Sequence, residues 1–225
     1  MQTLAGDLML LALDDDRGTV SWQHSTALRY GLGGALLMDL AQQERVESLD
    51  DKIVLVDPSP TGDDVLDAAL NAIATSNKPR DARYWVESLG GRSGLKEQLS
   101  RQLVARGILR EQEREFLRVF HDHRFPTDDS GPESSLRGLL RDAALGATEP
   151  DTRTLLLLSL VNACKLADDL FSREERSQAL SRIKELVEGE QFGKAVSKAI
   201  AAAAAATAAA ASAVFTATVA PGASH

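Results

Sequence analysis

The chain has 225 residues and a formal net charge of −8 at pH 7, with 44% hydrophobic and 26% charged residues. These values are ordinary for a globular protein that buries a core, and the length suits one large domain or two small ones. The single cysteine, Cys164, excludes an internal disulfide and a cysteine-based zinc site. Because the total charge is acidic, an anionic partner has to bind at a local basic patch.

The N-terminal sequence lacks the pattern of a secretory signal. Residues 1–18 have no positively charged start, and their apolar run meets Asp14, Asp15 and Asp16. We therefore expect a cytoplasmic protein. Arg outnumbers Lys by 18 to 7, and Ala, Leu, Gly and Asp are abundant, which indicates a bacterial source.

Helical periodicity dominates the first part of the chain, with short extended segments between the helices. The predicted elements are a helix over 4–12, a strand over 19–22, a helix over 35–43 that begins after Gly33-Gly34, and a hairpin over 45–56 with Asp50-Asp51 at its turn. Next, Asp63 or Asp64 is the expected cap of a helix that buries residues 65–73.

The central part of the chain predicts two helices and a second hairpin. A helix over 82–89 holds Trp85 and is closed by Gly90-Gly91. Ser93 is the expected cap of the following helix, and Gly107 lies just after its end. Residues 108–120 then indicate another hairpin.

The second half is more purely helical, with predicted helices over 134–145, 152–171 and 172–188. The helix over 152–171 is apolar nearly all round and should be central, and the next one opens with a capping box at Ser172–Glu175. Phe192–Phe215 is rich in alanine. We expect it to form a packed helix rather than a membrane span, because alanine contributes little transfer free energy.

No repeat and no Pro- or Ser-rich linker divides the sequence. We therefore expect a mainly α fold: a single helical domain over 1–218 with a few short β-hairpins and an alanine-rich C-terminal helix, followed by a frayed tail over 219–225.

The sequence offers little for catalysis. It has no nucleophile elbow, phosphate-binding glycine loop or HExxH motif. The acidic turn 14–16 is expected to be solvated, His121 and His123 lack a third metal ligand, and Cys164 lies in the most apolar helix, where a thiol is inert. We expect no enzymatic activity, no metal and no cofactor.

The helix-plus-hairpin units over 34–56 and 93–120 have the shape of winged helices, which commonly bind DNA. The first unit has no basic residue on its helix, whereas the second has Lys96, Arg101 and Arg106. Because the net charge is −8, DNA binding is the less favoured alternative, and we expect no nucleic-acid partner.

Five segments keep an order and spacing that match a known family: LALDDDRGTVSW, GLGGALLMDLAQQERVE, PTGDDVLDAALNAI, WVESLGG and LSRQLVARGIL. Together they resemble the Golgi phosphoprotein 3 family, peripheral proteins that bind phosphatidylinositol 4-phosphate on membranes. The resemblance implies a mostly helical domain with short hairpins, in agreement with the elements above. It also implies peripheral membrane association through an anionic phospholipid headgroup.

The family's headgroup site combines a loop tryptophan with basic side chains, and the resemblance places it at Trp22, Arg29, Gly33, Arg92 and Lys96. Arginine and lysine suit a phosphate through charge-assisted hydrogen bonds, and tryptophan is favoured at a membrane interface. Trp22 lies two residues farther from the glycine motif than in the family, so His24 competes for its place.

The chain departs from the family at two basic positions. Where the family has arginine in its G-L-R-G motif, this chain has Gly33, whose amide is expected to assist binding together with that of Gly34. Lys96 is retained, but the second basic position falls on Ser93, with Arg92 adjacent. We expect Arg29 to replace the missing charge from the loop side. Cations at a helix start oppose the helix dipole, so Arg92 and Lys96 favour an anionic partner.

The alternative is an adaptor on the same scaffold that does not bind lipid, and the resemblance implies that such a protein holds the cytosolic tails of membrane proteins. Acidic stretches at 14–16 and 111–115 suit basic peptides. Weak self-association is a further alternative that the sequence leaves open.

Overall fold

A computed structural model describes residues 3–13, 20, 22–110, 112–116, 120–124 and 130–188. Its elements are, in chain order, α1 (Leu4–Ala12), α2 (Trp22–Gln42), β1 (Val46–Leu49), β2 (Lys52–Leu55), α3 (Asp64–Ala74), β3 (Arg80–Asp81), α4 (Ala82–Gly90), α5 (Leu95–Ala105), β4 (Gln112–Phe116), β5 (Phe120–Arg124), α6 (Ser130–Leu145), α7 (Thr152–Ala163), α8 (Ala167–Leu170) and α9 (Arg176–Glu188). The fold is mainly α, as the sequence predicts.

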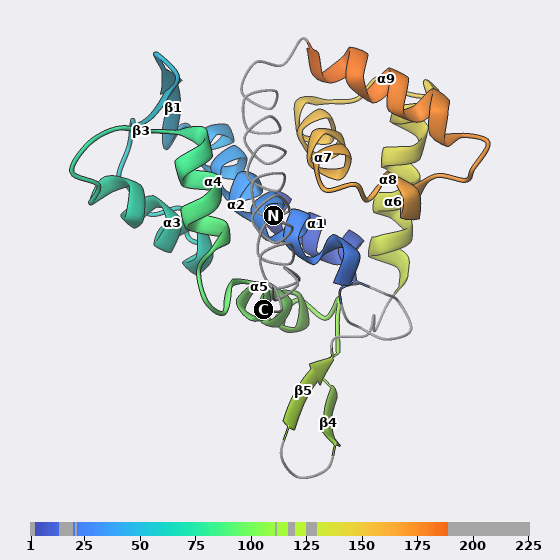
Figure 1. The fold of residues 1–225 in the computed structure, drawn as a ribbon, viewed down its shortest axis with the longest axis horizontal. Coiled ribbons are helices and arrows are strands. Elements are labelled where there is room, and N and C mark those ends of the chain that lie inside the picture. The colour runs from blue at the N-terminus through green and yellow to red at the C-terminus, as the bar shows by residue number, and fades with distance from the viewer. Residues whose placement is uncertain are drawn as a thin grey trace, which may run out of the picture.

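The helices α1 and α2 form the centre of the described fold (Figure 1). Every residue of α1 from Leu4 to Leu11 is buried, because this helix contacts α2, α5, α6 and α7. The longer helix α2 also packs against α3, α4 and α7. Figure 1 shows α3 and α4 on one side of α2 and α6 to α9 on the other.

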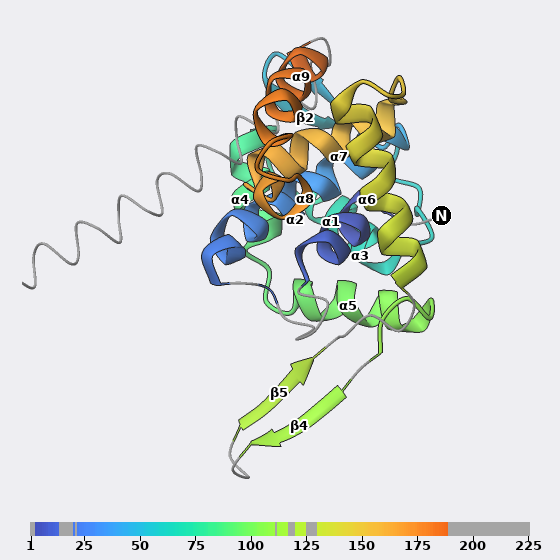
Figure 2. The same ribbon diagram turned by 90° about the vertical axis from the view of Figure 1, so that its right-hand side faces the viewer.

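The predicted hairpin over 45–56 is confirmed, whereas the second hairpin lies over 112–124 and not over 108–120 as predicted. β1 and β2 are antiparallel, and Asp50 and Asp51 between them have φ angles of 49° and 60°, as a two-residue type I′ turn requires. β3 adds two residues to the other edge of β2, giving the sheet order β1-β2-β3. β4 and β5 form a separate hairpin that extends away from α5 (Figure 2).

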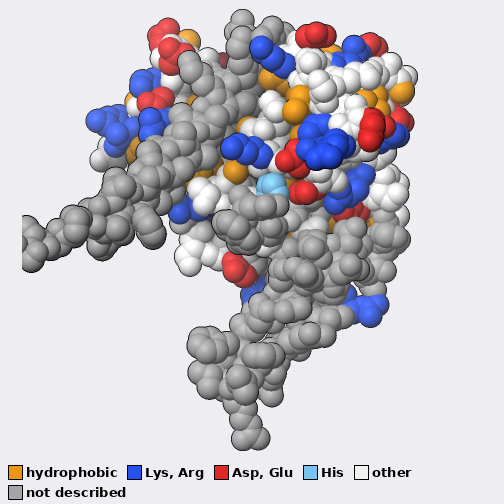
Figure 3. Space-filling model, turned by 45° about the vertical axis from the view of Figure 1, so that its right-hand side comes forward, with side chains coloured by type: hydrophobic (Ala, Val, Ile, Leu, Met, Phe, Trp, Pro, Cys, Tyr) orange, Lys and Arg blue, Asp and Glu red, His pale blue; other side chains and the backbone are white. Residues whose placement is uncertain are grey.

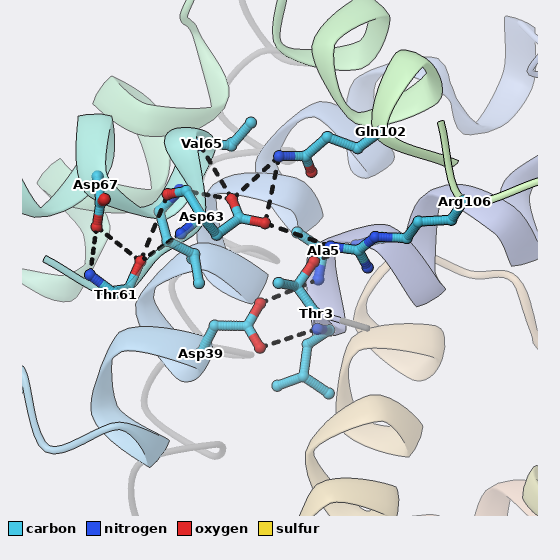
Figure 4. Close-up of polar contacts among 12 residues, drawn as sticks. Thr3, Ala5, Asp39, Thr61, Asp63, Val65, Asp67, Gln102 and Arg106 are labelled. Carbon is cyan, nitrogen blue, oxygen red and sulfur yellow. Dashed lines mark hydrogen bonds and ion pairs between the residues drawn. The ribbon is translucent and has the colours of Figure 1, made fainter. Parts of the chain in front are cut away.

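A buried carboxylate fixes the start of α1. Asp39 of α2 is 4% exposed, and its carboxylate accepts hydrogen bonds from the amides of Leu4 and Ala5 at 2.9 and 3.2 Å (Figure 4). Burial raises the pKa of Asp39 to about 7, although these two hydrogen bonds act in the opposite direction. The amides of a first helical turn need acceptors, so this contact holds α1 against α2.

A second carboxylate joins α3 to α5. Asp63 caps α3 by accepting hydrogen bonds from the amides of Val65 and Leu66. Of the two caps that the sequence predicts, Asp63 and Asp64, the structure has the first. The same carboxylate accepts a hydrogen bond from Gln102 and forms an ion pair with Arg106 at 3.6 Å (Figure 4). Asp63 therefore sets the position of α5 relative to α3.

Two predicted boundaries are wrong. α2 already begins at Trp22, so the helix start predicted at Gly33-Gly34 is incorrect and Trp22 does not belong to the strand predicted over 19–22. Val20 forms one antiparallel bridge to Leu13, and residues 19 and 21 lie outside the described residues. The helix predicted over 152–171 is divided into α7 and α8, because Lys165 between them has a φ angle of 59°.

The predicted helix over 192–215 and tail over 219–225 lie outside the described residues, and the single domain over 1–218 stays a prediction. Of the helices that are described, none is long and apolar enough to cross a bilayer.

Candidate functional site

Three of the predicted site residues line one cavity of about 240 Å³, which lies where the end of α4 meets the start of α5. We refer to it as the α4–α5 cavity. Its lining residues are Arg29 and Leu32 of α2, Gly90 to Arg92, and Gly94 to Glu97. Its volume is below that of drug-sized pockets, which suits a small polar group.

Each cation in the α4–α5 cavity is positioned by neutral neighbours. The Arg29 guanidinium lies 5.1 Å from the centre of the Tyr30 ring, and Lys96 Nζ donates to Ser25 Oγ at 3.2 Å. Arg92 Nη1 donates to the carbonyl oxygen of Ala68 at 2.8 Å. Within the described chain, none of these three cations forms an ion pair with a carboxylate.

The charge of Lys96 is partly buried. Burial is the main cause that lowers the pKa of Lys96, and the neighbouring Arg29 lowers it further, while Glu97 acts in the opposite direction. Glu97 also lines the cavity, so the lining residues carry three positive charges and one negative charge. A cavity with this balance favours an anion.

The start of α5 adds to the positive potential. Gly94 is the N-cap residue with a φ angle of 78°, and no side chain caps this helix end. The expectation that Ser93 caps α5 is therefore wrong. Because the N-terminal end of a helix is electropositive and Lys96 lies in its first turn, an anion bound here would interact with both.

Gly33 does not lie at a helix start but in the middle of α2, where its amide belongs to the helical hydrogen-bond ladder. The expectation that the amides of Gly33 and Gly34 assist binding is therefore wrong. Gly33 has a packing role instead: a Cβ added there would collide with the carbonyl oxygen of Val86 and would lie 2.7 Å from the amide nitrogen of Gly90. The missing side chain lets α2 and α4 cross closely.

Trp22 and His24 have different positions. Trp22 is the first residue of α2, and its side chain lies outside the described part of the structure. His24 is buried, and its Nε2 lies 3.3 Å from Asp169 Oδ2. His24 is not among the residues that line the α4–α5 cavity.

The sequence did not identify Ser25, Tyr30 or Glu97 as part of this region. Arg29 lies one helical turn before Gly33 on α2, not on a loop as expected. Once α2 is known to begin at Trp22, the spacing of Ser25 and Arg29 places both on the same helical face.

The arginines on α6, α7 and α9 differ from the cations of this cavity because each forms an ion pair with a carboxylate. Arg141 pairs with Glu175, and Arg176 Nε lies 3.1 Å from Asp168 Oδ1. Figure 3 shows basic and acidic side chains lying side by side on this face of the molecule. The unpaired cations of the α4–α5 cavity are therefore the stronger candidate for binding an anion.

Other residues considered for chemistry give no site. Cys164 is buried, and burial raises its pKa to about 12. In the part of the chain that is described, no cluster of three His, Cys, Asp or Glu residues suits a metal ion. Residues 14–16 and the side chains of His121 and His123 lie outside the described residues.

Two comparisons with known proteins bear on the family of the chain. A family model described as Golgi phosphoprotein 3 (GPP34) matches residues 4–203. Vacuolar protein sorting-associated protein 74 of Eremothecium gossypii is 28% identical to the chain over an alignment that covers 87% of this chain and 70% of that protein. These matches do not support the bacterial source predicted from composition. Because the family model spans most of the sequence, the chain belongs to the Golgi phosphoprotein 3 (GPP34) family.

Proposed function

We propose that the chain binds the phosphate-bearing headgroup of an anionic lipid in the α4–α5 cavity and thereby associates peripherally with a membrane at its cytoplasmic face. The family resemblance favours phosphatidylinositol 4-phosphate and a Golgi location. The observation that supports the proposal is that Arg29, Arg92 and Lys96 all line one cavity and have no carboxylate partner in the described chain, although the Arg92 guanidinium is bonded to the carbonyl oxygen of Ala68.

The electrostatics favour a phosphate monoester over a singly charged group. A monoester carries nearly two negative charges, and a charged hydrogen bond is worth about 1.5–3 kcal/mol. Arg29, Lys96 and the uncapped start of α5 would supply donors, and Arg92 adds positive charge at the cavity wall. Binding an anion would also offset the unfavourable partial burial of Lys96.

Arg29 explains how the site can work without the family's arginine. That arginine corresponds to Gly33, where the crossing with α4 leaves no room for a side chain. Arg29 comes from the preceding turn of the same helix, and its guanidinium lies close to Gly91, because a Cβ added at Gly91 would be 3.3 Å from Arg29 Nη2. The charge is thus supplied from one turn away.

Vesicle co-sedimentation tests the proposal. Phosphatidylcholine vesicles are compared with vesicles that also contain phosphatidylinositol 4-phosphate, phosphatidylinositol or phosphatidylserine, with the last two adjusted to equal surface charge. We expect the pelleted fraction of the protein to be larger with phosphatidylinositol 4-phosphate vesicles than with the other anionic vesicles. Equal pelleting with all four compositions would contradict the proposal.

Matched variants locate the binding to the cavity. Arg29→Gln and Lys96→Gln each remove one cation, and we expect each to weaken vesicle binding about tenfold or more. Arg173→Gln is the control, because Arg173 is an exposed arginine between α8 and α9 and its loss changes the net charge equally. Equal weakening by all three variants would indicate nonspecific attraction instead of a built site.

The proposed role is non-enzymatic. The adaptor alternative and weak self-association stay predictions, because the acidic stretch at 14–16 and the side chains of 111–115 lie outside the described residues.

A further inference from the structure

The three-stranded sheet is incomplete along one edge of β2. The strand runs from Lys52 to Leu55, but its pairing with β3 stops at Ile53↔Arg80. Continuing this register would place Val54 opposite Pro79. The next hydrogen-bonded pair in this register would join Leu55 to Lys78, but β3 begins only at Arg80, so no strand of the described chain continues the ladder beyond Ile53.

The open edge presents backbone groups that have no strand partner. Leu49 and Lys52 flank the two-residue turn and form a hydrogen-bonded pair, and such pairs alternate along an antiparallel hairpin. Lys52 and Val54 therefore direct their backbone groups toward β1, whereas Ile53 and Leu55 direct theirs toward β3. In the described chain Ile53 pairs with Arg80, but no strand residue pairs with Leu55 on that side.

A cavity of about 220 Å³ lies beside this edge, and we refer to it as the β2-edge cavity. It is lined by Ile53 to Leu55 of β2, by Ile73, Ala74 and Ser76 near the end of α3, by Asn77 to Pro79, and by Trp85 of α4. Ile53, Ile73 and Trp85 are buried, so the cavity has an apolar floor. Its volume suits one or two side chains better than a drug-sized ligand.

An aromatic side chain forms part of the cavity wall. Trp85 is 3% exposed, and its Nε1 has no hydrogen-bond acceptor anywhere in the described part of the chain. Because this N–H is itself shielded from solvent, a ligand in the cavity would contact the apolar part of the indole ring. The exposed apolar side chains of Leu55 (37%) and Val56 (52%) continue the apolar surface along the strand.

From this geometry we infer that the β2 edge is a docking surface for an extended peptide segment of a partner protein, which adds a strand beside Leu55. The partner's backbone pairs with the open edge, and an aliphatic side chain enters the β2-edge cavity and packs against the Trp85 indole. Lys78 lines the cavity, so the favoured segment lacks basic residues and carries an acidic one near Lys78. Strand addition is the mode in which backbone groups provide affinity and pockets provide specificity.

This surface is separate from the proposed lipid site. Figure 1 shows β3 and α5 at opposite ends of α4. The β2-edge cavity and the α4–α5 cavity have no lining residue in common. The inference therefore does not rest on lipid binding, and either can fail alone.

The test uses a displayed library of random decapeptides, selected on the full chain and counter-selected on the double variant Val56→Glu/Lys78→Glu. Both positions are exposed, so the double variant should fold, and we expect it to pellet with vesicles like the wild type. Enriched peptides should alternate apolar and polar residues and lack Lys and Arg. A synthetic copy of an enriched peptide should shift the Trp85 Nε1–H resonance, assigned with Trp22→Phe, and slow hydrogen exchange at the Leu55 amide.

Three controls separate strand addition from other modes of binding. N-methylation at alternate residues of the peptide should weaken binding about tenfold, because methylated amides cannot pair with a strand edge. Leu139→Glu, which removes an apolar side chain 49% exposed on α6, should bind the peptide like the wild type. Octanoate alone should leave the Trp85 resonance unchanged.

Four results would overturn the inference. They are a selection with no enrichment over the double variant, peptides that tolerate N-methylation, an unmoved Trp85 resonance, and a shift caused by octanoate without peptide enrichment. The last would assign the cavity to an acyl ligand.

Discussion

The crossing of α2 and α4 at Gly33 allows a quantitative prediction. A Cβ at Gly33 would meet backbone atoms of Val86 and Gly90, which cannot move aside as a flexible side chain can. Overpacking of this kind costs up to about 3 kcal/mol, and the higher helix propensity of alanine offsets about 1 kcal/mol of this. We therefore expect Gly33→Ala to lower the free energy of unfolding by about 2 kcal/mol.

Gly138→Ala is the matched control, because Gly138 lies inside α6 and a Cβ there would meet no heavy atom within 4 Å. It should raise the free energy of unfolding by about 0.5–1 kcal/mol. Urea denaturation followed by circular dichroism measures both changes. If Gly33→Ala is as stable as the wild type, or if both variants change stability in the same direction, the result would contradict the close crossing of α2 and α4 at Gly33.

The same crossing has a consequence for binding. Gly90 lines the α4–α5 cavity, so separating α2 from α4 would also displace the cavity wall. We expect Gly33→Arg, which restores the family's residue, to weaken rather than strengthen vesicle binding. Stronger binding by this variant would show that the arginine fits and that Arg29 does not replace it.

Three further predictions concern buried or capping groups. Because burial raises the pKa of Asp39 from 3.8 to about 7, the folded state holds this proton more tightly than the unfolded state. The free energy of unfolding should therefore fall as pH rises from about 4 to about 7, by at most about 1.4 kcal/mol per pH unit, and urea titrations of Asp39→Asn should lack this component. Asp63→Ala, which removes the α3 cap, should lower stability by about 1–2 kcal/mol, and a similar loss in Asp64→Ala would contradict that assignment. The thiol of Cys164, with a pKa raised to about 12, should react with a maleimide only as urea unfolds the chain, and rapid labelling of the native protein would refute its burial.

Local signals predicted many of the elements. The Asp50-Asp51 turn, the Asp63 cap of α3 and the capping box at Ser172–Glu175 depend on residues within a few positions of one another. In the capping box, the Ser172 amide and the Glu175 carboxylate pair at 3.3 Å, and the Glu175 amide and the Ser172 hydroxyl at 3.4 Å. Such contacts are read directly from sequence spacing.

The start of α2 could not be predicted because it depends on distant contacts. Glycines in a helix each cost about 1 kcal/mol relative to alanine, so the run Gly31 to Gly34 indicated a boundary. In the structure these glycines permit close packing: a Cβ at Gly31 would collide with Cys164 Sγ, and one at Gly33 with α4. Tertiary packing therefore outweighs helix propensity here.

The candidate site was predictable only in part. The family resemblance placed Arg92 and Lys96 in the site, and the helix dipole added a physical reason, because cations at a helix start are electrostatically unfavourable without an anion. The positions of Arg29 and Ser25 depend on where α2 begins, so their place in the cavity could not be derived from local spacing. The side chain of Trp22 lies outside the described residues, and its role at the membrane stays a prediction.

The most direct test of the anion site is backbone NMR of the chain titrated with the soluble headgroup inositol 4-phosphate, with inositol as the uncharged control. We expect inositol 4-phosphate to shift the amide resonances of Leu95, Lys96 and Glu97 at the start of α5, and we expect inositol to leave them unchanged. Unchanged amides at saturating inositol 4-phosphate, or shifts confined to other regions of the chain, would contradict phosphate binding in the α4–α5 cavity.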